Sequence, residues 1–261
     1  MSTQDQMKIV HEIVNNAIDY IESNPGYLGL LLCEGTPTSL DVKLYRKVYP
    51  KLHVLPAGGC SDIQRMLQSV KKRMRGYPTF GIIDRDARTK YEVRKLSKRG
   101  IFCTKLPFIE NIISSPEIVR LLGKYKGINI DEGIEKVQDK LLMLLSSSLR
   151  DTLPVNISHP PEQKVSSITF TIKLENGQVI EKTVSSSNII YAYRDKAVAN
   201  ETADIFGIIG RRRYYKFFEE CLEDPVLCEK ILKCAKTYLP DIEMKLNEEL
   251  SKSKDITNDS N

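Results

Sequence analysis

Several features that mark common classes of protein are missing from this sequence. It has no tryptophan, and its three histidines, at positions 11, 53 and 159, are isolated, so neither a zinc centre nor a histidine-activated nucleophile is indicated. The six cysteines occur singly, without a C-x-x-C pair, which favours reduced thiols. No apolar stretch approaches the roughly 20 residues of a membrane-spanning helix. A Walker A motif is also absent, which argues against ATP binding by a P-loop.

The N-terminal segment has no basic region followed by an apolar one, so no secretory signal is expected. Together with the unpaired cysteines, this predicts a cytoplasmic protein without a membrane partner. The length of 261 residues, 41% of them hydrophobic and 28% charged, is ordinary for one large or two modest globular domains.

What the sequence has in excess is local positive charge. The net charge is +5, but residues 43–105 hold 17 Lys and Arg against 4 Asp and Glu, a local excess of +13 that leaves the rest of the chain at −8. One basic helix is usually only a solvated face. Three neighbouring basic elements favour a polyanionic partner such as nucleic acid.

Apolar runs alternate with helical patterns through the first part of the chain. The expected strands cover residues 27–33, 52–55, 79–83 and 101–106, and the expected helices cover residues 9–21, 39–49, 61–74 and 89–99. Strands that are apolar on both faces and separated by helices predict an α/β fold with a parallel four-stranded sheet flanked by helices.

After residue 107 the alternation stops. Helices are expected over residues 116–122, 134–149 and 224–238, and a β-hairpin over 167–174 and 179–184, joined through Asn176-Gly177. The sequence thus predicts a first domain over residues 1–125, a mostly helical extension with a hairpin over 126–246, and a disordered tail over 247–261.

Three carboxylates follow two of the expected strands directly. Glu34 comes after the first strand, and Asp84 and Asp86 come after the third. The carboxyl ends of parallel strands meet at one edge of a sheet, and carboxylate oxygens are the ligands that Mg²⁺ or Mn²⁺ prefers. Other interpretations remain open: Glu34 can cap a helix, and the two aspartates can form a turn, or Asp86 can pair with Arg85 or Arg88.

Four motifs in this order resemble a known family. They are residues 30–35 (LLLCEG), the Gly58-Gly59 turn, residues 80–86 (FGIIDRD) and residues 107–111 (PFIEN). Together they resemble the TOPRIM domain, the metal-dependent catalytic fold of topoisomerases, primases and nucleases of the overcoming-lysogenization-defect-like group. The resemblance covers roughly residues 27–125, and more loosely 191–218. It is closest to stand-alone TOPRIM proteins that act as effectors beside an ABC-type ATPase in phage defence, as in PARIS systems.

The resemblance implies the roles of four acids. Glu34 would be a metal ligand and the general acid-base, Asp84 and Asp86 would bind Mg²⁺ or Mn²⁺, and Glu110 would be a further metal-binding acid. Related nucleases usually carry another acid four residues after the first glutamate, where this chain has Thr38, so the number of metals stays open.

The resemblance also implies a nuclease that cuts RNA such as tRNA, held in check by an ABC-type ATPase and acting as a homodimer. The expected phosphate-binding residues are Lys71, Lys72, Arg73, Arg85, Arg88, Arg211, Arg212, Arg213 and Lys216. Around residues 211–217 the aromatic side chains either stack on bases or face the core.

Two other functions remain open. One is a non-catalytic regulatory or scaffold subunit that keeps the fold and has lost a metal. The other is a receiver-like phosphoacceptor, which also gathers acids at strand ends; Lys105, after the fourth strand, is its weak support.

Overall fold

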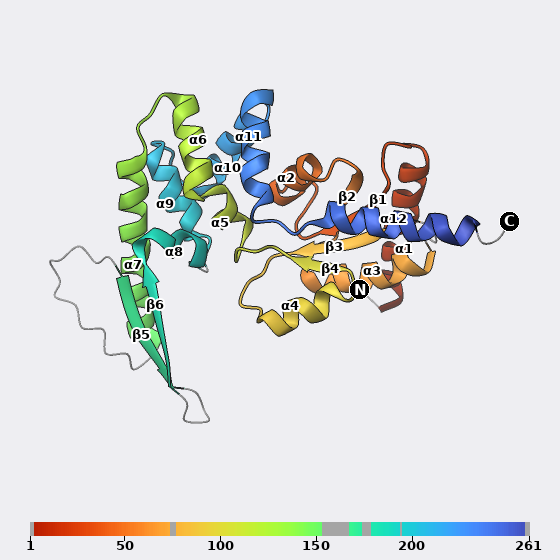
Figure 1. Ribbon diagram of the computed structural model, residues 1–261, viewed down its shortest axis with the longest axis horizontal. Helices are drawn as coiled ribbons and strands as arrows, with labels where there is room; N and C mark the ends of the chain where they lie inside the picture. The colour runs from red at the N-terminus through yellow and green to blue at the C-terminus, as the bar shows by residue number, and fades with distance from the viewer. Residues whose placement is uncertain (1–2, 74–76, 153–166, 174–178, 194, 259–261) are drawn as a thin grey trace. The chain divides into compact units, whose positions relative to one another are not determined.

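The chain forms two compact units. The computed structural model describes residues 3–73, 77–152, 167–173, 179–193 and 195–258 (Figure 1). The first unit combines Met1–Lys105 with Lys236–Asn261, and the second is Leu106–Ala235. Residues 106–125, which the sequence analysis groups with the first domain, therefore belong to the second unit.

The first unit contains a four-stranded sheet. Its strands are β1 (Gly29–Cys33), β2 (Leu52–Pro56), β3 (Thr79–Ile83) and β4 (Ile101–Cys103), and their order is β2-β1-β3-β4. All three pairings are parallel, which confirms the predicted α/β fold with a parallel four-stranded sheet. Every residue of β1 and β3 is buried, and these are the two central strands, as their unbroken apolar runs require.

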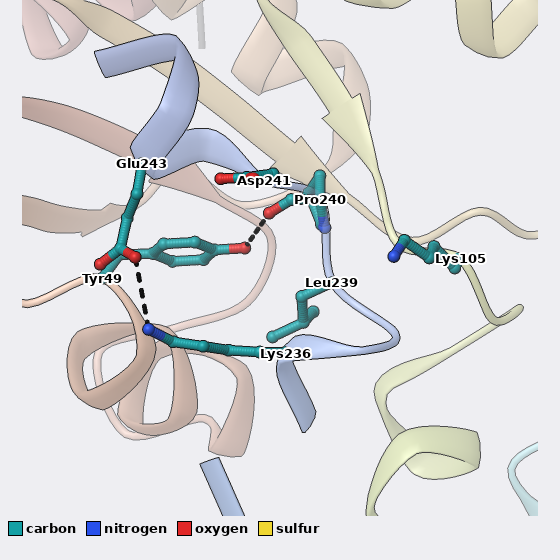
Figure 2. A pocket seen from close by; sticks show the side chains of 7 residues that line it. All are labelled: Tyr49, Lys105, Lys236, Leu239, Pro240, Asp241 and Glu243. Atoms are coloured by element: carbon teal, nitrogen blue, oxygen red, sulfur yellow. Dashed lines mark hydrogen bonds and ion pairs between the residues drawn. The ribbon is translucent and has the colours of Figure 1, made fainter. Parts of the chain in front are cut away.

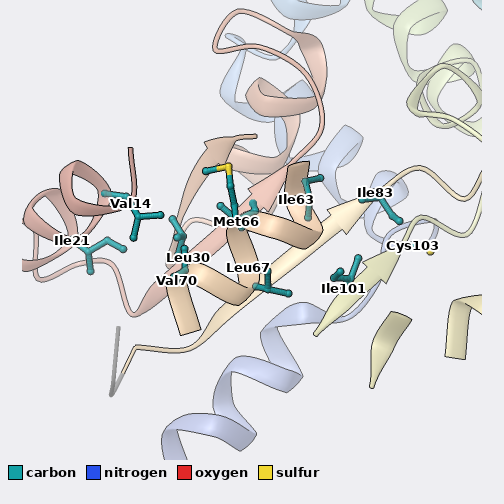
Figure 3. Packing of buried hydrophobic residues seen from close by; sticks show 12 residues of the cluster. Val14, Ile21, Leu30, Ile63, Met66, Leu67, Val70, Ile83, Ile101 and Cys103 are labelled. Carbon is teal, nitrogen blue, oxygen red and sulfur yellow. The ribbon is translucent and has the colours of Figure 1, made fainter. Parts of the chain in front are cut away.

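Helices cover this sheet. They are α1 (Thr3–Glu22), α2 (Leu40–Val48), α3 (Cys60–Arg73), α4 (Lys90–Ser97) and α12 (Ile242–Asn258). One buried cluster joins Val14 and Ile21 of α1, Ile63 and Val70 of α3, and Leu30 of β1 (Figure 3). The helical spacing of these apolar residues places them on one side of each helix, which is why both helices pack on the same core.

The last part of the chain returns to the first unit after the second unit is complete. The Lys105 N–H donates to the Tyr238 carbonyl at 2.8 Å, and the Lys105 Nζ donates to the Thr237 carbonyl at 2.8 Å. Figure 2 shows the small pocket there, of about 260 Å³, where the Tyr49 hydroxyl donates to the Pro240 carbonyl at 2.7 Å. These bonds fix the start of α12 in the first unit.

Helix α12 continues to Asn258, through residues that were predicted to be a disordered tail. Ion pairs one turn apart accompany it, between Lys245 and Glu248 at 2.7 Å and between Lys252 and Glu249 at 3.0 Å. Such pairs stabilise an exposed helix modestly. The prediction of disorder rested on the polar composition of this segment, which does not show which charges are spaced to pair.

The second unit is mostly helical. Its helices are α5 (Ile109–Ile113), α6 (Pro116–Lys126), α7 (Asp131–Thr152), α8 (Ser186–Ala192), α9 (Ala197–Ile205), α10 (Arg211–Cys221) and α11 (Pro225–Lys236). Strands β5 (Ser167–Lys173) and β6 (Val179–Ser185) pair antiparallel, which confirms the predicted hairpin, while its Asn176-Gly177 turn lies outside the described residues. Within the described chain, no helix combines the length and the apolar character needed to span a membrane.

Helices α5 and α6 belong to this unit because their side chains are built into it. The buried Asn111 amide donates to the Ile190 carbonyl at 2.7 Å and to the Tyr193 carbonyl at 2.9 Å. Val119 of α6 packs in one cluster with Ile134, Ile189 and others. Such contacts between distant parts of the chain leave no local sequence signal, so the boundary before residue 106 could not be predicted.

Gly81 of β3 tests the close contact between the sheet and α3. A Cβ atom at this position would lie 2.8 Å from the Ile63 Cγ2 atom and 3.3 Å from Ile101. We expect Gly81→Ala to lower the free energy of unfolding by about 1–3 kcal/mol, the usual cost of overpacking a core. Urea denaturation measures it. The control is Gly26→Ala, where a Cβ meets nothing within 4 Å; equal effects of the two substitutions would contradict the packing described.

Candidate active site at the carboxyl ends of the central strands

Two of the predicted site residues meet where β1 and β3 end. These strands are neighbours, with Cys33 in register with Ile82, so Glu34 and Asp84 leave the same edge of the sheet. The Asp84 N–H donates to the Glu34 Oε2 atom at 3.1 Å. The structure therefore joins the first two elements of the predicted acidic site by a direct hydrogen bond.

Glu34 lies in an environment that favours its neutral form. Burial raises the pKa of its carboxyl group above the ordinary value, and the negative charge of Asp86 raises it further. The hydrogen bond from the Asp84 N–H, the Arg88 charge and a backbone N–H of Cys60 oppose this rise in pKa. A half-buried carboxyl group with a raised pKa can accept and return a proton nearer to neutral pH than a free glutamate.

The turn after Glu34 is fixed by glycine. Gly35 has φ of 98°, in the left-handed region, and its N–H donates to the Gly58 carbonyl at 2.9 Å. A Cβ at Gly35 would lie 2.4 Å from the Ser39 Oγ atom. The Glu34-Gly35 turn and the Gly58-Gly59 turn, which the sequence presents as separate motifs, are thus one structure that holds the Glu34 backbone.

Asp86 is paired with an arginine. It is the one non-glycine residue with positive φ, at 47°, in the part of the chain that the structure describes. Its Oδ2 atom accepts a hydrogen bond from Arg88 Nη1, which also donates to the Asp84 carbonyl at 2.7 Å. Arg88 Nη2 lies 3.4 Å from the Cys60 sulfur. Of the interpretations that the sequence left open for Asp86, the structure shows the pair with Arg88.

The other arginine of the motif, Arg85, is held on the β4 side. Its N–H donates to the Thr104 Oγ1 atom at 3.0 Å, and its Nη1 atom lies 3.5 Å from the Lys105 carbonyl. Thr104 is buried directly after β4. Sequence analysis missed this threonine; a hydroxyl residue directly after an apolar strand was the available signal.

Glu110, which the resemblance implies as a further metal-binding acid, belongs to the second unit, in α5. Its carboxyl group is buried, accepts a hydrogen bond from the Tyr215 hydroxyl at 2.5 Å and lies 3.6 Å from Lys196 Nζ. Neither Tyr215 nor Lys196 was identified from the sequence as a partner of this acid. In the structure Glu110 links three helical segments of the second unit.

The predicted phosphate-binding residues of α3 lie at its C-terminal end. Lys71 and Arg73 are exposed, with Lys71 Nζ donating to the Arg99 carbonyl at 3.0 Å and Arg73 Nη1 donating to Asn15 at 3.0 Å. The Lys72 side chain lies outside the described residues. The exposed positive groups agree with a surface that attracts a polyanion.

Most basic residues of α10 face solvent, and most of its aromatic residues face the core. Arg212, Arg213 and Lys216 are exposed and Arg211 is partly buried at the first position of the helix, whereas Tyr214, Phe217 and Phe218 are buried. These three aromatic side chains are therefore part of the core and are not available to stack on bases, while the partly buried Tyr215 donates its hydroxyl to Glu110. The cations remain as a candidate phosphate-binding surface of the second unit.

With this geometry in view, the chain was compared with known proteins. No protein-family model, curated protein or solved structure matches it. The TOPRIM resemblance therefore stays a prediction that rests on its four motifs and their order.

The acids do not form a finished metal centre. Among the described residues there is no group of three or more His, Cys, Asp and Glu side chains arranged to hold a metal ion. At this edge of the sheet, two of the acids already have hydrogen-bond donors. Arg88 donates to the Asp86 carboxylate, and the Asp84 N–H donates to the Glu34 carboxylate. The six cysteines are unbridged thiols, and Cys33, Cys103, Cys221 and Cys228 are buried.

Tyr215→Phe tests whether Glu110 has a structural role in the second unit. Removing the hydroxyl leaves a buried acceptor without its short hydrogen bond, so we expect the free energy of unfolding to fall by about 1–3 kcal/mol in EDTA. The control is Tyr191→Phe, whose hydroxyl donates to the exposed Glu117 at 2.9 Å; there the expected change is within about 0.5 kcal/mol. Thermal and urea unfolding measure both. An unchanged stability for Tyr215→Phe would contradict the structural role.

Proposed function

We propose that this protein is a nuclease effector of an anti-phage defence system that hydrolyses phosphodiester bonds, with RNA such as tRNA as its substrate. The observation that carries the proposal is the bond between the Asp84 N–H and the Glu34 carboxylate at the carboxyl ends of adjacent parallel strands. Active sites of parallel α/β sheets lie at this edge. The order of motifs around it is the order found in TOPRIM nucleases.

Glu34 is the proposed general acid-base. Burial raises the pKa of its carboxyl group, which suits transfer of a proton between water and the scissile phosphate. The Gly35 N–H fixes the backbone that follows Glu34 by donating to the Gly58 carbonyl, and the Asp84 N–H holds the Glu34 carboxyl group itself. Asp84 lies beside it at the end of β3.

The charge distribution supports a nucleic-acid substrate. The segment of residues 43–105, with its local excess of +13, contains Asp84 and Asp86, and this positive charge offsets the repulsion between these acids and phosphate. In the first unit Lys71 and Arg73 are exposed, and in the second unit Arg212, Arg213 and Lys216 are exposed. We propose that these cations bind the phosphate backbone, which carries no base sequence.

The proposed cofactor is Mg²⁺ or Mn²⁺, which would supply a polarised phosphate oxygen and an activated water. Glu34, Asp84 and Asp86 offer the oxygen donors that suit such an ion. Their arrangement in this structure does not fit it, because Asp86 is engaged by Arg88. The site is therefore proposed as one that must rearrange before it holds metal.

This mismatch fits the proposed regulation. An effector that stays inactive until infection must have a conformation that cannot react. We propose that an ABC-type ATPase partner, together with homodimer formation, converts this conformation into the active one. The same mismatch also favours a second candidate function, a non-catalytic regulatory or scaffold subunit of such a complex, since Thr38 stands where related nucleases have an acid.

Cleavage of nucleic acids distinguishes the two. We expect the protein, alone or together with an ABC-type ATPase encoded beside it, to cleave tRNA or other RNA in Mg²⁺ or Mn²⁺. Glu34→Ala should lower the rate at least about 100-fold, the usual contribution of a general acid-base group. Gel electrophoresis of labelled RNA and DNA measures the rates.

The matched control is Glu132→Ala, which removes an exposed acid of α7 and should leave the rate unchanged. If Glu34→Ala cleaves as fast as the wild type, the assigned site is wrong. If the wild type cleaves no nucleic acid with or without the ATPase, the non-catalytic function is favoured.

A further inference from the structure

The Arg88 guanidinium is directed into the acidic edge of the sheet. Nη1 donates both to the Asp86 carboxylate and to the Asp84 carbonyl, and Nη2 lies beside the Cys60 sulfur. The arginine side chain is only 20% exposed, against 43% for Asp86. An ion pair between two freely exposed side chains contributes little, but this guanidinium is largely withdrawn from water and has several partners.

The backbone around Arg88 is shaped to make this contact. The Arg88 N–H donates to the Arg85 carbonyl at 3.0 Å, which closes a four-residue turn after β3. Within the turn Asp86 adopts a left-handed conformation, with φ of 47°, that non-glycine residues seldom adopt although aspartate tolerates it. The turn directs the Asp86 carboxylate toward the guanidinium that follows two residues later.

The charge of Arg88 also acts on the neighbouring acid. Burial raises the pKa of Glu34 most strongly and the charge of Asp86 raises it further, whereas the charge of Arg88 lowers it. A single cationic group thus interacts with two of the three carboxylates and with a backbone carbonyl. Oxygen atoms of carboxylates and of backbone carbonyls are also the donors that a hard divalent cation takes.

From these contacts we infer that Arg88 is a positioning residue that occupies the place of a divalent cation at Asp86, so that guanidinium and metal compete for the same carboxylate. The inference rests on the proposed function and concerns the regulation of that site. Metal binding then requires Arg88 to leave Asp86. The released guanidinium has paired N–H groups suited to a phosphate, which connects this contact with the phosphate-binding role predicted from the sequence.

Removing the Arg88 charge should change the affinity of the site for Mn²⁺, which can be measured without an activity assay. In metal-free protein titrated with Mn²⁺ and followed by electron paramagnetic resonance, Arg88→Gln should bind Mn²⁺ about fivefold to tenfold more tightly than the wild type, since a competing charge has been removed. Arg88→Lys keeps the charge but loses the planar pair of donors, so its affinity should lie between the two.

The matched control is Arg85→Gln. It removes an equal charge from the same turn, but the Arg85 guanidinium contacts the Lys105 carbonyl and not Asp86. Its Mn²⁺ affinity should change by about twofold or less, because losing one positive charge that does not contact Asp86 acts on the metal only through screened, long-range electrostatics. An equal gain in both variants would overturn the specific competition at Asp86.

The remaining outcomes separate the inference from the proposed function. If Arg88→Gln binds Mn²⁺ no more tightly than a wild type that cleaves nucleic acid through Glu34, Arg88 is only structural and the inference fails alone. If neither protein binds Mn²⁺ and neither cleaves, both fail. Should Arg88→Gln be unfolded in EDTA, Mn²⁺ must restore its thermal midpoint more than it raises that of the wild type; no such recovery overturns the inference.

Discussion

The pairing of β1 with β3 is the constraint on which the rest of the first unit depends. Both strands are buried along their whole length, so the hydrophobic effect favours their place at the centre of the sheet, where Cys33 lies in register with Ile82. Glu34 and Asp84 follow these strands without an intervening residue. Their positions are consequently set by the core, and the bond between them follows from the sheet itself.

Much of this was predictable from periodicity. The limits of β3 were predicted at Thr79 and Ile83, and the four parallel strands followed from apolar runs separated by helices. The convergence of Glu34 and Asp84 followed in turn, because carboxyl ends of parallel strands share an edge. What periodicity cannot give is the partner of a polar side chain. The choice of Arg88 over Arg85 for Asp86 depends on a left-handed backbone angle that no pattern of residue types specifies.

Glu110 shows the same limit at a larger scale. Its place in the sequence does not reveal its partners, Tyr215 and Lys196, which lie in the second unit more than 80 residues away along the chain. The aromatic residues of α10 were ambiguous for a related reason. A helix start rich in arginine and tyrosine has the same composition whether its rings face bases or the core, and only the packed neighbours decide.

The return of the chain to the first unit has a consequence for synthesis. Lys105, the last residue before the second unit, is bonded to Thr237 and Tyr238, just after it, so the second unit is an insertion whose two connections are adjacent in the first. Ile242 and Leu246, which are buried, also follow the second unit in the sequence. During synthesis, the packing of α12 on the first unit is therefore completed only after the whole second unit has been translated.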